Sequence, residues 1–245
     1  MTSEAGSDRW KGMIRIEEEL RFGGTIVAGI DEAGRGPLAG PVVAAAVVFT
    51  PGGYIEGVDD SKKLTRASRE SLYQQIMSQA QSVGVGAVDN CLIDEINILN
   101  ATFLAMDRAI GALTLRPGHL LIDGNRFRPG LSSAGIPFTT IVGGDASCFS
   151  VAAASIVAKV TRDRMMEQLD KEYPGFGFAK HKGYGTVEHR EAIERLGFCA
   201  IHRRSFNARI PVQITGPRRP GVPDEAMREN ANEITPDADP KETSA

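Results

Sequence analysis

The sequence predicts an α/β fold, because short segments rich in Val, Ile and Ala alternate with longer segments that have helical apolar spacing. A second observation is that several of the short segments end directly in Asp or Glu. A third is ordinary globular composition, with 42% hydrophobic and 24% charged residues. At 245 residues the chain is long enough for one large domain or two small ones.

The first elements surround a glycine-rich loop. Residues 1–23 are polar, with a short helix predicted at about 10–20. Segments 25–31 and 41–49 are predicted to be neighbouring strands joined by that loop, and proline and glycine at 51–53 end the second one. After a loop at 60–64, Thr65 is the expected N-cap of a helix that ends near residue 81.

The remaining elements continue the alternation. Three further strands are predicted at 83–88, 119–122 and 138–142. Helical spacing predicts helices at 93–113, 149–169 and 187–196, whereas the Gly-, Tyr- and Phe-rich segment 173–186 is expected to be a loop.

The end of the chain differs in composition from the rest. Six of the 13 prolines lie in 211–245, where large apolar residues are nearly absent, so we expect a disordered tail. It carries four basic and seven acidic residues, which leaves 24 of each in 1–210 and assigns the net charge of −3 to the tail. The predicted organisation is an N-terminal extension (1–23), a catalytic domain (24–210) and an acidic, Pro-rich tail (211–245).

Three features predict a cytoplasmic protein that does not enter membranes. No apolar run approaches the ~20 residues needed to cross a bilayer. Residues 1–11 lack the basic-then-apolar pattern of a signal peptide. The three cysteines show no close pairing, which favours neither disulfides nor a zinc site and fits a reducing compartment.

Residues 180–209 contain seven Lys or Arg residues and three Glu residues. Such a segment can form a basic surface for phosphates or an ordinary solvated helical face. Charge alone does not separate the two interpretations.

Carboxylates follow three of the predicted strands: Asp31 and Glu32, then Asp123, then Asp145. Strand ends at one edge of an α/β sheet gather side chains from distant parts of the chain. If the strands bearing Asp31 and Asp123 are parallel neighbours, their carboxylates lie side by side and repel each other. Mg²⁺ or Mn²⁺ would remove this repulsion, and two such ions can support phosphodiester hydrolysis.

Each of these acids also has a simpler explanation. An Asp after a strand is commonly a turn former or a helix cap, which applies to Asp123 and Asp145 taken singly. Asp31 and Glu32 are harder to explain in this way, because the loop Gly34-Arg35-Gly36 follows them. The combination of the four acids with the glycine loop favours a metal site.

Other candidates for substrate contact are less specific when taken alone. Arginine in a loop, such as Arg35, is usually solvated, and Lys62 is more often a surface charge than a phosphate contact. Tyr184 either packs on the domain or presents its ring to a sugar or base.

Taken together, six segments resemble bacterial ribonuclease HII. They span about 25–207 in the family's order: Gly29–Val42 (GIDEAGRGPLAGPV), Asp60–Leu64 (DSKKL), Leu121–Asn125 (LIDGN), Gly144-Asp145 with 152–163 (AAASIVAKVTRD), His181–Thr186 (HKGYGT) and His202–Phe206 (HRRSF). The resemblance does not extend to the first twenty-odd residues or to the tail after residue 210.

The resemblance implies a ribonuclease H-like fold, with a five-stranded mixed sheet flanked by helices and a small helical C-terminal region. It implies that Asp31, Glu32, Asp123 and Asp145 bind two Mn²⁺ or Mg²⁺ ions. It also implies that Gly34-Arg35-Gly36 reads a ribonucleotide 2′-hydroxyl, the group that distinguishes RNA from DNA, while Tyr184 packs on the adjoining deoxyribose. Ser61 and Lys62 complete the expected substrate-binding set.

The activity implied by the resemblance is hydrolysis of RNA paired with DNA. It includes cleavage 5′ of single ribonucleotides in duplex DNA, leaving 3′-hydroxyl and 5′-phosphate ends, with a role in ribonucleotide removal. The expected partner is the nucleic acid alone, bound by a monomer. One departure is Gly143, which stands where the family often has lysine.

Two alternatives remain. One is ribonuclease HIII-like specificity for several consecutive ribonucleotides. It is disfavoured because the chain shows no additional N-terminal domain. The other is a catalytically silent module that binds hybrids through 180–209, and the presence of all four acids opposes it.

Overall fold

The computed structural model describes residues 4–21 and 23–206, so the predicted tail at 211–245 lies outside the described residues. One five-stranded sheet has the order β3-β2-β1-β4-β5. Its β1–β2 and β2–β3 pairs are antiparallel and its β1–β4 and β4–β5 pairs are parallel, which confirms the mixed sheet. The strands are β1 (Val27–Ala33), β2 (Val42–Val48), β3 (Ser82–Val88), β4 (His119–Asp123) and β5 (Phe138–Ile141).

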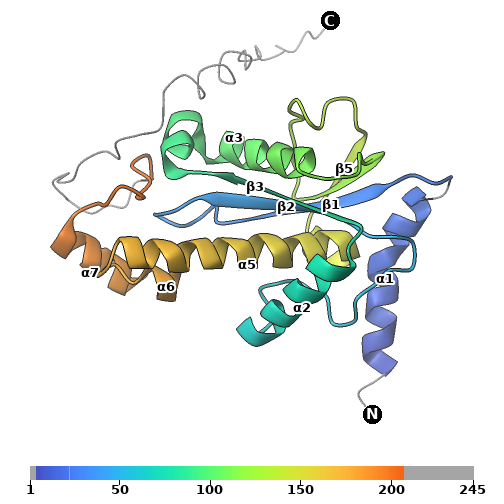
Figure 1. Cartoon of the computed structure of the whole chain (residues 1–245), viewed down its shortest axis with the longest axis horizontal. Coiled ribbons are helices and arrows are strands. Elements are labelled where there is room, and N and C mark those ends of the chain that lie inside the picture. Colours follow the sequence, from blue (N-terminus) through green and yellow to red (C-terminus); the bar gives the residue numbers. More distant parts are fainter. Residues whose placement is uncertain (1–3, 22, 207–245) are drawn as a thin grey trace, which may run out of the picture.

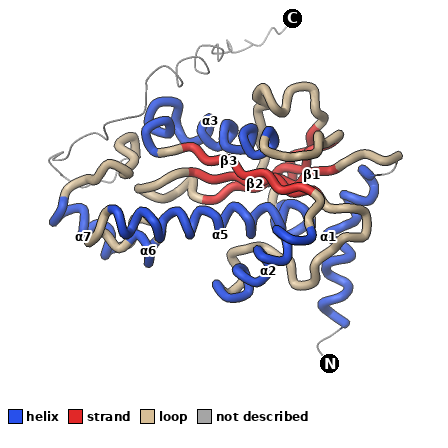
Figure 2. Tube along the Cα trace, in the orientation of Figure 1, coloured by secondary structure: helices blue, strands red, loops and turns tan. Residues whose placement is uncertain are grey.

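Two long helices cover the two faces of the sheet (Figure 1). Helix α3 (Asn90–Gly111) lies on one face and α5 (Phe149–Glu172) on the other. Strand β2 shows why both faces are apolar, since Ala45 and Val47 pack with residues of α5 while Ala44 and Ala46 pack with residues of α3. Figure 2 shows the same three layers by element type.

Glycines in the strands let these helices approach closely. A Cβ on Gly84 would lie 2.0 Å from the carbonyl oxygen of Ala109, and one on Gly86 would lie 2.1 Å from that of Ala105. A Cβ on Gly29 would lie 2.2 Å from the backbone of Ser150. The alternation of valine and glycine in β3 therefore reflects the packing of α3.

Helix boundaries follow their caps. Helix α2 (Arg66–Gln79) begins where predicted, because the Thr65 side chain accepts the N–H of Ser68. The helix predicted at 93–113 begins earlier, at Asn90, and is interrupted at Asn97, whose φ is +65°. The Asn97 side chain accepts the N–H groups of Leu99 and Asn100 and so caps the second part.

Helix α1 (Glu4–Arg21) is longer than the predicted 10–20 and is fastened to the domain by a buried acid. The Glu17 carboxylate accepts the N–H of Ser150 at 2.6 Å in the first turn of α5 and also binds Arg21. Cys148, the N-cap residue of α5, makes no side-chain capping bond. Glu17 therefore supplies that cap from the N-terminal helix.

The C-terminal part contains small helices around a histidine cluster. Helix α7 (Val187–Leu196) matches its prediction, but α6 (Phe178–His181) lies in the segment expected to be a loop, so that prediction was wrong for four residues. The short helix α4 (Gly144–Ser147) precedes α5. None of the described helices combines the length and apolar character needed to cross a membrane.

Candidate active site

Two of the four acids meet because their strands are parallel neighbours. Ile30 of β1 pairs with Ile122 of β4, so the next residues, Asp31 within β1 and Asp123 at the end of β4, lie at the same end of the parallel pair. Glu32 follows on β1. Asp145 comes from the first turn of α4, where it is 5% exposed.

Burial and the neighbouring negative charges make these carboxyl groups harder to ionise. Burial, together with the charges of Glu32 and Asp123, raises the pKa of Asp31 well above its usual value. Burial and the charge of Asp145 raise the pKa of Asp123. Burial also raises the pKa of Glu32, against the lowering effect of Arg35. The four acids therefore share one electrostatic neighbourhood.

Protein donors satisfy one oxygen of each carboxylate. The N–H of Glu32 donates to Asp31 at 2.6 Å, and the N–H of Gly144 donates to Asp123 at 2.7 Å. Arg35 Nη1 lies 3.2 Å from Glu32 Oε1, and Lys62 Nζ lies 3.0 Å from Asp145 Oδ2.

The donor chemistry of this set fits a hard divalent cation, although the side chains do not already stand as a cage. Within 4–21 and 23–206, no group of three or more His, Cys, Asp or Glu residues is arranged to hold a metal ion. Buried carboxylates that raise one another's pKa are nevertheless stabilised by a cation, and oxygen ligands favour Mg²⁺ or Mn²⁺. Asp31, Glu32, Asp123 and Asp145 are the residues that would hold it.

A pocket joins most of the predicted site residues. It is lined by Asp31, Glu32, Asp123, Gly34, Arg35, Gly36, Ser61, Lys62 and Tyr184. Asp145 is not part of the lining, but it bonds Lys62 and its charge acts on Asp123. Ser61 is buried and shares a 2.7 Å hydrogen bond with Ser155, which in turn bonds Asp31. Ser61 thus acts through Ser155 on an acid.

The glycine loop and Tyr184 form the other wall. Gly34 has a φ of +95°, which favours glycine. A Cβ on Gly36 would meet only the ring of Tyr184, at 3.7 Å. Tyr184 is 45% exposed, so its ring is presented at the pocket rather than packed into the domain.

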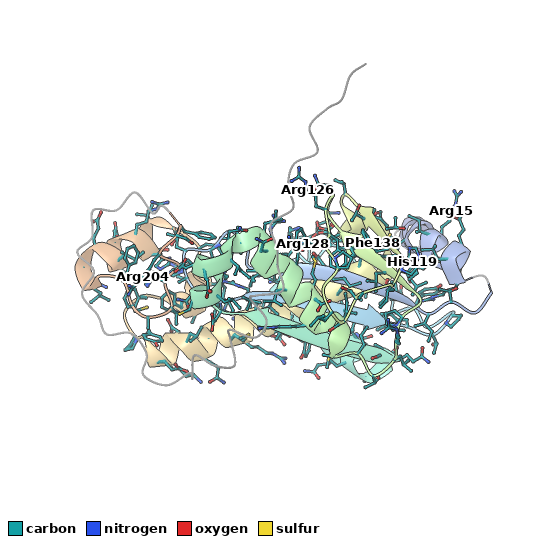
Figure 3. The ribbon with its side chains drawn as sticks, turned by 90° about the horizontal axis from the view of Figure 1, so that it is seen from above. Arg15, His119, Arg126, Arg128, Phe138 and Arg204 are labelled. Atoms are coloured by element: carbon teal, nitrogen blue, oxygen red, sulfur yellow. The ribbon has the colours of Figure 1, made fainter. Side chains whose placement is uncertain are left out.

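Two exposed cations follow Asp123 in the chain. Figure 3 labels Arg126 and Arg128, which belong to the loop after β4 and are exposed. Of the basic segment 180–209, by contrast, Lys182 and Arg203 are buried, so that segment is not one continuous solvated face.

The candidate set from the sequence omitted two pocket cations. Lys159 and Arg162 line the pocket from α5 and were not among the predicted site residues. The available signal was Lys159 within the otherwise small and apolar run Ala152–Val160, with Arg162 directly after it.

Comparisons with known proteins agree with this geometry. The family model described as Ribonuclease HII matches residues 28–209. The relative named Ribonuclease HII in Acetivibrio thermocellus is 55% identical over 193 residues, covering 79% of this chain and 74% of the relative. That of Geobacter metallireducens is 55% identical over 186 residues, covering 76% and 85%.

Solved structures show the same fold. Ribonuclease H2 from Pyrococcus horikoshii OT3 is 33% identical with a TM-score of 0.62, covering 75% of this chain and 94% of that one. Bst-RNase HIII in complex with Mn²⁺ is 21% identical with a TM-score of 0.60, covering 75% and 68%, and shows the fold alone. The sheet, its flanking helices and these matches together confirm the ribonuclease H-like fold, and the chain belongs to the ribonuclease HII family of enzymes.

Proposed function

We propose that this enzyme hydrolyses the RNA strand of RNA–DNA hybrids and cleaves duplex DNA on the 5′ side of an embedded ribonucleotide. The products are 3′-hydroxyl and 5′-phosphate ends. The observation that carries the proposal is the meeting of mutually destabilised carboxylates with a backbone loop in one pocket. Family membership supports the same class of substrate.

The metal-binding role is assigned to Asp31, Glu32, Asp123 and Asp145. Bound Mg²⁺ or Mn²⁺ ions would supply an activated water and stabilisation of the leaving oxygen. Fixed donors, such as the N–H of Gly144, hold the carboxylates in place. Mutual repulsion favours cation uptake, because a cation relieves the cost of burying several like charges.

The remaining pocket residues bind and orient the nucleic acid. Gly34, Arg35 and Gly36 line the pocket, and the backbone at the two glycines can approach a 2′-hydroxyl without obstruction by their own side chains. The Tyr184 ring beside Gly36 offers an apolar surface for the adjoining deoxyribose. Lys62, whose pKa is raised by its bond to Asp145, keeps a positive charge available to a phosphate.

The decisive experiment is metal-dependent cleavage of a duplex that contains one ribonucleotide, with the product ends identified. We expect cleavage in Mg²⁺ or Mn²⁺, inhibition by EDTA, and 5′-phosphate ends at the ribonucleotide. Cleavage of long hybrids alone would favour HIII-like specificity. Hybrid binding without any cleavage would favour the silent binding module and would reject the proposed function.

We also propose that the enzyme acts as a cytoplasmic monomer in removing ribonucleotides from DNA. Its soluble-type catalytic domain and its family support this role. Its mass in solution and the accumulation of ribonucleotides in DNA when it is deleted would test these points.

A further inference from the structure

Two arginines are buried beside the pocket without an acid partner. Arg162 and Arg203 are each 1% exposed. In the described part of the chain, no hydrogen bond or ion pair joins either guanidinium to a carboxylate. Their guanidinium groups instead donate to six main-chain carbonyl oxygens.

Five of those six carbonyls belong to residues 34–41, here named the substrate loop. Arg203 donates to Gly34 at 2.6 Å, to Arg35 at 2.9 Å and to Gly40 at 2.9 Å. Arg162 donates to Pro41 at 2.8 Å and to Ala39 at 3.2 Å. The two side chains hold both ends of the loop from its interior side.

This hold fixes which way the loop's amides point. In a trans peptide the C=O and the following N–H point in opposite directions. Because the carbonyls of Gly34 and Arg35 are directed at buried Arg203, the N–H groups of Arg35 and Gly36 are directed away from it. Gly34, Arg35 and Gly36 line the pocket and Arg203 does not, so that opposite side is the pocket side.

The loop is also shaped to accept the arginines. A Cβ on Gly34 would lie 1.9 Å from Arg162 Nε, so the guanidinium packs directly on this backbone. Burial lowers the pKa of Arg162 to about 10 and that of Arg203 to about 9, which leaves both charged at neutral pH. A buried cation is costly, and here its carbonyl partners are concentrated on one functional loop.

We propose that Arg203 is a positioning residue for ribose selection: it turns the carbonyls of Gly34 and Arg35 inward so that the following amides face the sugar. Arg162, which lines the pocket, fixes the other end of the loop through Ala39 and Pro41. This inference rests on the proposed function, and it assigns no contact between Arg203 and the substrate.

The test compares Arg203→Lys with the wild-type enzyme. Lysine keeps the charge but cannot hold three carbonyls in one planar fork. We expect kcat/KM on a duplex with one ribonucleotide to fall at least about tenfold. The Ki of the same duplex in all-DNA form, used as a competitor, should stay within about twofold, because general binding does not use the loop amides.

Arg21→Lys is the matched control. Arg21 is also buried and donates to a carbonyl, that of Phe49, but it does not touch the substrate loop. We expect it to lower the melting temperature and to leave kcat/KM unchanged at temperatures where it is folded. If Arg203→Lys melts below the assay temperature, it is compared with the wild type at a lower temperature at which both proteins are folded, with the same expected result.

The outcomes separate the two proposals. A wild-type enzyme that does not cleave the ribonucleotide duplex rejects the proposed function. If the wild type cleaves and the folded lysine variant matches its kcat/KM, the positioning role is rejected alone. Loss of kcat/KM accompanied by an equal rise in the DNA competitor's Ki likewise rejects it, since that pattern indicates general damage.

Discussion

The two walls of the pocket bury charges of opposite sign in different ways. On the acid side (Asp31, Glu32, Asp123 and Asp145), each carboxylate has a protein donor, yet burial and like charges raise the pKa of Asp31 and Asp123. On the loop side (residues 34–41 with Arg162 and Arg203), five loop carbonyls and that of Lys182 satisfy two buried cations. The loop side is complete as folded, whereas we propose that a cation completes the acid side.

This difference explains how one pocket can combine rigid recognition with cation-dependent chemistry. A preformed loop selects a sugar without reorganising. A repulsive acid cluster binds divalent ions because they relieve strain that the fold already contains. The following predictions test this division, beginning with the largest expected effect.

Asp31→Asn and Asp123→Asn test whether the acid side performs the chemistry. Each change preserves size and removes a charged ligand, so we expect cleavage to fall by at least about 10³-fold. Binding of an RNA–DNA hybrid should stay within about threefold, measured by fluorescence anisotropy. Asp89→Asn is the control, because Asn is an equally good N-cap for α3 outside the pocket. Full activity in either pocket variant would remove the acids from the mechanism.

Gly34→Ala and Gly36→Ala test the loop side. At Gly34 a methyl group meets Arg162 and the φ is positive, so we expect about 10²-fold lower kcat/KM and a lower melting temperature. At Gly36 a methyl group has space beside Tyr184, so stability should be unchanged while KM rises about threefold to tenfold. Equal behaviour of the two variants would contradict a preformed loop.

Asp31→Asn and Glu17→Gln compare two buried acids whose pKa is raised by burial, one beside other acids and one bonded to Arg21 and to the N–H of Ser150. The folded pKa of Asp31 is raised, so its ionised form weakens the fold as pH rises through that pKa. Without metal at pH 7, Asp31→Asn should therefore stabilise the protein. Glu17→Gln should destabilise it by about 1–3 kcal/mol, because it weakens the cap on α5 and leaves Arg21 unpaired.

Urea unfolding in EDTA measures both changes. The gain in Asp31→Asn should shrink as pH is lowered, because protonation then neutralises the wild-type carboxyl. Saturating Mn²⁺ should raise the wild-type protein above the variant. Destabilisation by Asp31→Asn in EDTA at pH 7 would show that this acid is already satisfied.

The buried histidines His189 and His202, which support the backbone of Tyr184, test whether a polar network next to the pocket stays uncharged. The N–H of Cys199 donates to His202 Nδ1, so His202 donates from Nε2 to His189, which donates from Nδ1 to the Tyr184 carbonyl. Burial lowers the pKa of both His189 and His202 to about 4. Because the folded pKa values are depressed, their stability contribution is present above about pH 6.5 and is lost as pH falls towards 4.

We expect about 1 kcal/mol of lost stability per histidine between pH 7 and 5.5. Proton NMR of the ring C–H signals measures the pKa values directly. Stability is measured in the Asp31→Asn variant, because protonation of Asp31 in the wild type would change the free energy of unfolding in the opposite direction as pH falls. Ordinary pKa values near 6.5 for both His189 and His202 would contradict this closed network.

Much of the local structure follows from the sequence because its causes are local. Thr65 caps its helix as predicted, and the apolar runs that end in Asp31 and Asp123 are strands. The kink at Asn97 was not predicted, since the apolar spacing continues through it while one backbone φ turns positive. The fold class and the family motifs could also be predicted, because both are recognised from the order of segments along the chain.

What the sequence by itself determined is the set of acids, the glycine loop and the alternation of strands and helices. Only the tertiary structure decided that β1 and β4 are parallel neighbours and that Glu17 caps α5. The same holds for the burial of Arg203 under a loop 169 positions away in the chain. The physical reason is that residue spacing governs local geometry, whereas burial and charge pairing depend on segments brought together only by folding.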